Sequence, residues 1–228
     1  MKITGDNWPN RTAAALLGAL ACLALPACKQ SADANKTVNE PPKAARESSA
    51  QARGEGLLVQ QAASSCRQRI QEAATEHAAN AKQMQEARVL AMNGVTQREQ
   101  LEAKREVVRR FLASNEALKS LLVNEQAAYT ETLAKLNVPQ ARIETESRAF
   151  QSSIRDKALF LRKRETDQHI GNALLGALDF LDELWGQWNY NKEYDQVQFS
   201  PPGALQKYND FLAAIEAAFK EQKELQEQ

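Results

Sequence analysis

Apolar residues recur every three or four positions along most of the chain, which is the spacing of one face of an α-helix. Between Leu57 and Asn137 the chain has a single glycine, Gly94, and no proline. The residues that share a face before this glycine are Val59, Ala62, Cys66, Ile70, Ala73, His77, Ala81 and Met84. The pattern predicts a first long helix that ends at Gly94.

Three further apolar stripes follow, separated by residues that break helices. A second helix is expected to reach about Leu136, and Pro139 begins a third that carries Trp185 and Trp188. Its polar stretch at 162–168 is expected to bend or fray, and a last helix is expected at about 203–224. Long helices joined by short breaks favour antiparallel neighbours. The sequence therefore predicts an all-α fold, an elongated antiparallel helical bundle with long coiled-coil-like helices, over residues 56–228.

The stretch that precedes these helices has a different composition. In residues 29–55 the only large apolar side chain is Val38, and Pro41-Pro42 and Gly54 interrupt the chain. A segment without an apolar face cannot repay the entropy of ordering its backbone. Residues 28–55 are therefore interpreted as a disordered tether.

An uncharged segment near the N-terminus is typical of a targeting signal. Residues 12–28 (TAAALLGALACLALPAC) lie between Arg11 and Lys29, and they are fewer than the roughly 20 residues that a spanning helix needs. A basic start, an apolar middle and a small-residue end are typical of a secretory signal peptide. We interpret residues 1–27 as that signal.

The end of the signal carries a more specific motif. Leu25-Pro26-Ala27-Cys28 resembles the lipobox of bacterial lipoproteins, although Pro26 departs from the usual small residue. The resemblance implies cleavage before Cys28 and attachment of diacylglycerol to its sulfur. By likeness to enteric lipoproteins, Lys29 favours the outer membrane, facing the periplasm. A competing box that ends at Cys22 fits less well, because Ala19 stands where leucine is expected. A plain signal peptide and an uncleaved anchor are the alternatives.

The charge and the cysteine content of the chain limit the classes of partner that we expect. Lys and Arg total 29, Asp and Glu total 29, and the formal net charge is zero, so the chain lacks the basic character of a nucleic-acid binder. With Cys22 removed and Cys28 acylated, only Cys66 would remain, and its place on the apolar stripe predicts a small buried side chain. We expect a membrane contact through acyl chains on Cys28, a protein partner and no nucleic acid.

No motif for a catalytic, cofactor-binding or metal site stands out. His77 lies on an apolar stripe, which favours a buried core position over a ligand role. Glu165 and His169 share a helical face, but two ligands do not complete a metal site. We therefore predict a protein that is not an enzyme and that has no cofactor or metal.

Aromatic residues are concentrated near the C-terminus. None occurs from Cys28 to Arg110, whereas nine of the fourteen lie between Phe180 and Phe219. The segment 186–203 (GQWNYNKEYDQVQFSPPG) reads as a turn-rich loop that carries Trp188, Tyr190, Tyr194 and Phe199. Such side chains dominate binding hot spots. The loop is either a partner-binding tip made of these four residues or an aromatic plug that closes one end of the bundle.

The same region carries a second resemblance. Gln198-Phe199, followed by Tyr208-Asn209 at the start of a helix, resembles the C-terminal part of an uncharacterised family of enterobacterial helical lipoproteins. The resemblance covers about fifteen residues and implies a helical lipoprotein without implying an activity.

These observations lead to one functional hypothesis and two alternatives. The first is a non-enzymatic, lipid-anchored periplasmic protein that acts through protein–protein binding in the cell envelope. The alternatives are an immunity or inhibitor-type lipoprotein that blocks a toxic periplasmic enzyme, and a small-ligand carrier or enzyme.

Overall fold

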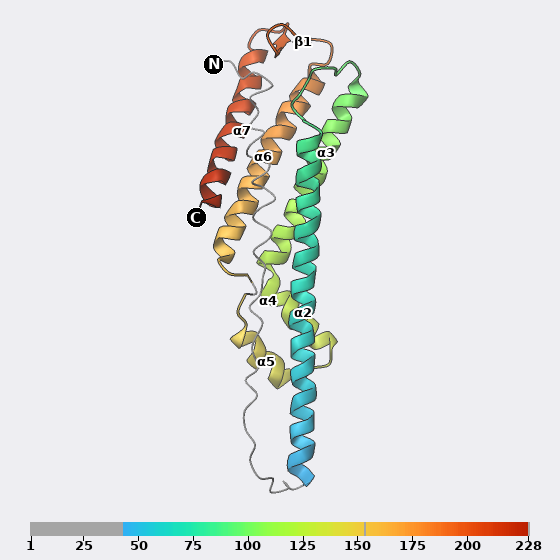
Figure 1. Ribbon diagram of the computed structural model, residues 1–228, viewed down its shortest axis with the longest axis vertical. Coiled ribbons are helices and arrows are strands. Elements are labelled where there is room, and N and C mark those ends of the chain that lie inside the picture. The colour runs from blue at the N-terminus through green and yellow to red at the C-terminus, as the bar shows by residue number, and fades with distance from the viewer. Residues whose placement is uncertain (1–42, 153, 228) are drawn as a thin grey trace.

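The computed structural model describes residues 43–152 and 154–227, and it describes side chains from residue 51 onward. The described residues form six helices and one two-stranded sheet: α2 (Lys43–Glu86), α3 (Arg98–Val123), α4 (Glu125–Lys135), α5 (Gln140–Ala149), α6 (Lys157–Glu183), β1 (Trp188–Asn191), β2 (Gln196–Phe199) and α7 (Ala204–Gln226). The helices run up and down along one long axis (Figure 1). The prediction of an all-α bundle is confirmed.

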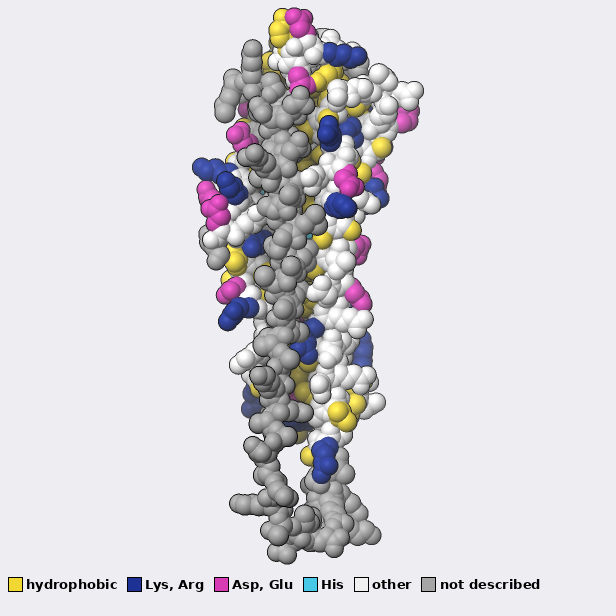
Figure 2. Space-filling model, viewed as in Figure 1, with side chains coloured by type: hydrophobic (Ala, Val, Ile, Leu, Met, Phe, Trp, Pro, Cys, Tyr) yellow, Lys and Arg dark blue, Asp and Glu magenta, His cyan; other side chains and the backbone are white. Residues whose placement is uncertain are grey.

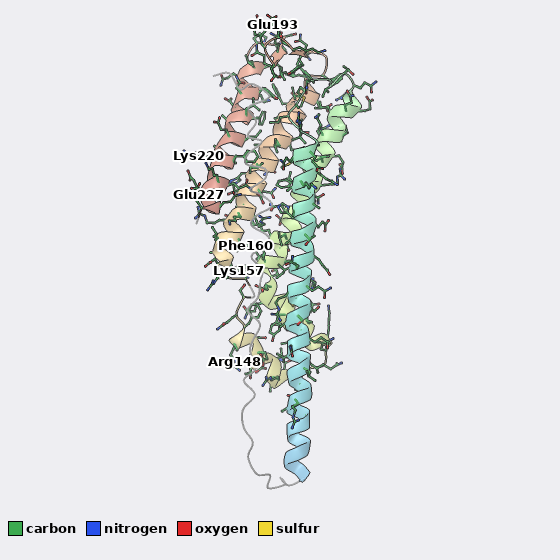
Figure 3. The ribbon with its side chains drawn as sticks, viewed as in Figure 1. Arg148, Lys157, Phe160, Glu193, Lys220 and Glu227 are labelled. Carbon is green, nitrogen blue, oxygen red and sulfur yellow. The ribbon has the colours of Figure 1, made fainter. Side chains whose placement is uncertain are left out.

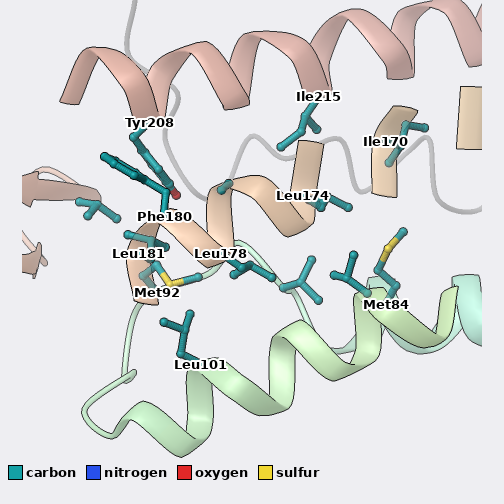
Figure 4. Close-up of a cluster of buried hydrophobic side chains, with 14 of the residues drawn as sticks. Met84, Met92, Leu101, Ile170, Leu174, Leu178, Phe180, Leu181, Tyr208 and Ile215 are labelled. Carbon is teal, nitrogen blue, oxygen red and sulfur yellow. The ribbon is translucent and has the colours of Figure 1, made fainter. Parts of the chain in front are cut away.

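The half of the bundle that carries the hairpin β1–β2 contains the largest cluster of buried apolar side chains. There α6 packs against both α3 and α7, and α3 packs against α2. The largest side chains that are almost completely buried in this core are Met92, Leu101, Val108, Ile170, Leu174, Leu178, Leu181 and Ile215. Figure 4 shows several of them meeting between α3, α6 and α7. We call this cluster the main core.

The other half of the bundle is held by two smaller clusters. Tyr129 and Leu133 of α4 pack with Ala62 and Cys66 of α2 and with Ile143 of α5. Between this cluster and the main core, Ile70 and Ala74 of α2 pack with Leu118, Leu122 and Ile154. The long helix α2 therefore lies along all three clusters.

Ion pairs reinforce the packing of α3 on α6 at the surface. Arg98 donates two hydrogen bonds to the Asp182 carboxylate, at 2.6 and 3.0 Å, and Arg105 donates one to Asp179 at 2.7 Å. The neighbouring Arg98 guanidinium lowers the pKa of Asp182. Figure 2 shows that charges of both signs are interspersed over the visible face of the bundle.

The expected boundary of the tether is wrong, because α2 begins at Lys43 and the thirteen residues 43–55 are helical. Residues 43–55 lack an apolar face, but eight of the thirteen are Ala, Arg or Glu, which favour helix. They extend a helix whose packed part begins near Leu58 and Val59, and extension adds residues more easily than nucleation does. The rest of the expected tether, residues 28–42, lies outside the described residues.

Three helix breaks also differ from the prediction. The first long helix ends at Glu86 and not at Gly94, and Arg88 follows it in the left-handed conformation with φ 43°. The second predicted helix is divided at Asn124, whose side-chain amide donates to the Ser120 carbonyl at 2.9 Å. The third is interrupted after Ala149 and resumes at Lys157, after Asp156 in the left-handed conformation with φ 55°. The polar stretch 162–168, where a bend was expected, is regular helix. Its inward-facing polar side chains have partners inside the bundle, as described below.

Candidate functional site

The segment 186–203, predicted as a loop, is a β-hairpin. Trp188 pairs with Phe199 and Tyr190 pairs with Val197, in antiparallel register. The turn is closed by Asn191, whose Oδ1 accepts hydrogen bonds from the backbone N–H groups of Glu193 at 2.9 Å and Tyr194 at 3.2 Å. The loop assignment was wrong because the aromatic and polar residues of this segment alternate with the period of a strand.

One face of the hairpin lies on the bundle. The residues that share this face are Trp188, Tyr190, Val197 and Phe199, and all of them pack in or against the main core. The Trp188 indole N–H donates to the Leu181 carbonyl at 2.7 Å, and its ring meets Trp185 edge-on at 5.6 Å. The expectation that Trp188 lies on a helix is wrong, because α6 ends at Glu183.

The second strand seals the main core beneath α7. The Phe199 ring lies 5.8 Å from the Phe180 ring and 5.4 Å from the Tyr208 ring, measured between centroids. Tyr208 is buried, and burial raises the pKa of its phenol to about 12. Gly203, at φ 78°, begins α7 from the left-handed conformation that glycine tolerates best. Trp188, Tyr190 and Phe199 thus occupy the positions of an aromatic cap.

Tyr194 differs from the other three predicted binding residues. Its side chain is in the turn, and the residue is 55% exposed, while Leu205 at the start of α7 is 52% exposed. Figure 3 places Glu193, the neighbour of Tyr194, at the extreme end of the bundle, opposite the end at which α2 begins. Tyr194 is therefore an exposed aromatic side chain at the far end of the molecule from Lys43.

Inside the bundle, charged and polar side chains from four helices meet in what we call the buried polar centre. His77 of α2 lies with Nε2 3.0 Å from Asp167 Oδ2 and with Nδ1 3.3 Å from Ser114 Oγ. The Asp167 carboxylate also forms an ion pair with Arg164, at 2.9 Å, and accepts a hydrogen bond from Gln222 of α7. The centre therefore joins α2, α3, α6 and α7.

Ser114, His77 and Asp167 are the residue types of the catalytic triad of a serine hydrolase. Their geometry can be compared with what a nucleophilic serine requires. A nucleophile must pass its proton to the base and reach a substrate. The Ser114 hydroxyl donates instead to the Phe111 carbonyl at 3.0 Å, and Ser114 and His77 are each only 6% exposed. The prediction that His77 is a buried core residue is confirmed. The arrangement pairs the buried side chains of His77, Asp167 and Gln222 and couples the positions of four helices, while the Nε of Arg164 has no hydrogen-bond partner among the described residues.

Sequence analysis singled out only His77 from this centre. Its partners carry a recognisable signal, because each stands on an apolar stripe: Asp167 is spaced with Ile170 and Leu174, and Gln222 with Ala218 and Leu225. Polar residues on the inner face of separate helices indicate a shared network. The pairing itself depends on which helices become neighbours, and a single stripe does not encode that.

The remaining candidate residues lie outside the buried polar centre. His169 and Glu165 are both exposed, and Glu165 lies 3.9 Å from the Lys119 ammonium. Within residues 43–152 and 154–227, no three His, Cys, Asp or Glu side chains are grouped as a metal site. Cys66 is buried, as predicted, and lines a cavity of about 10 Å³ with Arg69 and Glu125. That volume accommodates about one water molecule.

The predicted lipidation site, Cys28, lies outside the described residues. None of the helices in the described part of the chain is long and apolar enough to cross a membrane. Comparison with protein-family models, with curated proteins and with solved structures finds no match to this chain.

Proposed function

We propose that this chain is a lipid-anchored protein of the bacterial envelope that acts by binding another protein through the tip of its hairpin. Acyl chains on Cys28 hold it at a membrane, the outer membrane on its periplasmic side. The bundle is the spacer, and the turn that carries Tyr194 is the binding tip. No catalytic step is part of this proposal.

One observation carries the proposal: the exposed aromatic turn and the first residue of α2 lie at opposite ends of an elongated bundle (Figure 1). Only residues 29–42 separate Cys28 from α2, so the anchor enters the bundle at the end remote from Tyr194. A helix of 44 residues is about 65 Å long at 1.5 Å per residue. A tyrosine presented at that distance from the anchor is well placed to meet a partner away from the bilayer.

The first test concerns the anchor. Cys28→Ser should abolish incorporation of a fatty-acid probe in growing cells, because only a thiol forms the thioether. Cys22→Ser, in the poorer box, should label as the unaltered chain does. Metabolic labelling followed by gel analysis gives the result. Undiminished labelling of the Cys28→Ser chain would show that the lipobox has been assigned to the wrong residue.

The second test concerns the tip. A photoreactive phenylalanine analogue in place of Tyr194 should give one discrete cross-linked protein adduct in intact cells. The matched position is Val123, which is 56% exposed and lies on α3, away from the hairpin. It should give no such adduct. A chain that cross-links equally from both positions, or from neither, would contradict binding at the tip.

A further inference from the structure

The connection between α2 and α3 contains an asparagine followed by a glycine. Asn93-Gly94 is the only Asn-Gly pair in the chain, and both residues are exposed. The connection lies at the end of the bundle that carries the hairpin (Figure 1). The Val95 N–H donates to the Met92 carbonyl at 3.1 Å, which closes a four-residue turn with the pair at its centre. Gly94, at φ 84°, has the left-handed backbone that the third residue of a type II turn requires.

The two groups that react when asparagine loses its amide are both free in this turn. Asparagine is one of the thermolabile side chains. Its side-chain carbonyl carbon is the electrophile, and the backbone nitrogen of the next residue is the nucleophile. Within the described part of the chain, neither the Asn93 carboxamide nor the Gly94 N–H has a hydrogen-bond partner. A Cβ on Gly94 would meet no atom within 4 Å beyond the adjacent residues, so there is room for a ring to close between the two residues.

The other asparagines of the described residues lack this combination. Four of them lie inside helices, where the following backbone N–H is hydrogen-bonded: Asn80, Asn115, Asn172 and Asn209. Asn124 and Asn191 use their side chains in hydrogen bonds, and the N–H that follows Asn137 is hydrogen-bonded. Asn189 is held in a paired strand and is followed by Tyr190, whose side chain crowds the backbone nitrogen. Only Asn93 combines a free carboxamide, a free N–H after it and a glycine.

We propose that Asn93 is a site of spontaneous deamidation and isoaspartate formation in the folded protein. The Gly94 nitrogen bonds to Cγ of Asn93, the bond from Cγ to Nδ2 breaks, and the amide proton leaves with that nitrogen as ammonia. The product is a five-membered succinimide ring. One water molecule then adds to either ring carbonyl and opens the ring, which leaves aspartate or isoaspartate at position 93. Water is the only co-reactant, and no atom is oxidised or reduced.

The modification changes this end of the bundle in two ways. Both products carry one more negative charge than asparagine does. In isoaspartate the backbone passes through the former side chain, which adds one methylene to a turn whose first and last residues, Met92 and Val95, pack in or against the main core. This inference rests on the turn alone and requires neither the anchor nor the partner proposed above.

The test is prolonged incubation of the full chain in warm neutral buffer made with ¹⁸O water, followed by digestion with trypsin in ordinary water and by mass spectrometry. The tryptic peptide 89–98 should gain one ¹⁸O atom and separate into two species of equal mass, the aspartate and isoaspartate forms. Deamidation during digestion introduces ordinary oxygen and is thereby distinguished. The peptide 165–192, which contains Asn172, Asn189 and Asn191, should stay unlabelled. No ¹⁸O in peptide 89–98, or equal uptake by both peptides, would overturn the assignment.

A synthetic peptide with the sequence of residues 89–98 shows whether the folded turn permits the reaction. The folded protein should react at a rate within about tenfold of the rate in this peptide, because no opening of the fold has to precede ring closure. A larger slowing in the folded protein would mean that the turn protects Asn93, which contradicts the proposal.

Matched variants locate the reaction at one residue. Asn93→Gln should take up no ¹⁸O in peptide 89–98, because glutamine would have to close a six-membered ring, and it should fold normally because the side chain is exposed. Asn189→Gln changes an exposed asparagine of β1 and should leave the labelling of peptide 89–98 unchanged. Undiminished uptake in the Asn93→Gln chain would show that the reactive residue is a different one.

Discussion

Asp167→Ala should lower the free energy of unfolding by about 3–5 kcal/mol, the range measured when one partner of a buried ion pair is removed. Asp167 is 1% exposed and is the residue on which His77, Arg164 and Gln222 converge. Without its carboxylate, the Arg164 guanidinium, whose side chain is 14% exposed, would lack its buried counter-charge. Thermal and urea denaturation followed by circular dichroism give the size of the loss.

Asp210→Ala is the matched control for this change. Asp210 lies on the exposed side of α7, where it accepts one hydrogen bond from Gln206 at 2.8 Å. Its removal should change the free energy of unfolding by less than about 0.5 kcal/mol. A loss below about 1 kcal/mol for Asp167→Ala would show that the buried polar centre does not hold the four helices together.

Trp188→Ala should destabilise the fold by about 3 kcal/mol, at the low end of the range for tryptophan because the ring is half-buried. The variant loses the packing of the ring on Trp185 and the hydrogen bond to the Leu181 carbonyl. Tyr194→Ala removes an exposed ring and should change stability by less than about 0.5 kcal/mol. Denaturation of the two variants in parallel measures the difference.

The outcome for this pair separates the two functions of the hairpin. A large loss at Trp188 with none at Tyr194 is expected if the strands close the main core while the turn is free for a partner. A sharp loss of stability for Tyr194→Ala, with unchanged partner capture, would mean that the turn is only part of the cap.

The helices could be predicted because their information is local. The stripe through Ala62, Cys66 and Ile70 specifies both a helix and its buried face, and all three residues are buried. The residues at which the helices end could be predicted less well. The chain from Lys43 to Glu55 forms helix through intrinsic preference, without an apolar face. At the division at Asn124, both the backbone N–H and the side-chain amide of this residue donate to the Ser120 carbonyl.

The hairpin and the buried polar centre were the parts that sequence reasoning missed. In the segment from Gly186 to Gly203, Trp188 and Tyr190 alternate with asparagine, but strands of four residues are too short for this period to distinguish them from a loop. The polar centre depends on neighbours far apart along the chain, since His77 and Asp167 are brought together only when α2 and α6 both pack on α3. The spacing of residues within one helix does not predict that pairing.

The central claim is that the bundle holds its hairpin away from the membrane to which Cys28 is attached. Energy transfer from a fluorophore on the acylated chain to acceptor lipids in vesicles measures this directly. A label at Leu57→Cys, which is 67% exposed in the first half of α2, should transfer strongly, and a label at Tyr194→Cys should transfer weakly. Buried Cys66 is replaced by alanine in both chains so that each carries one reactive thiol. The account predicts a clear excess of transfer from position 57, and equal or greater transfer from position 194 would contradict it.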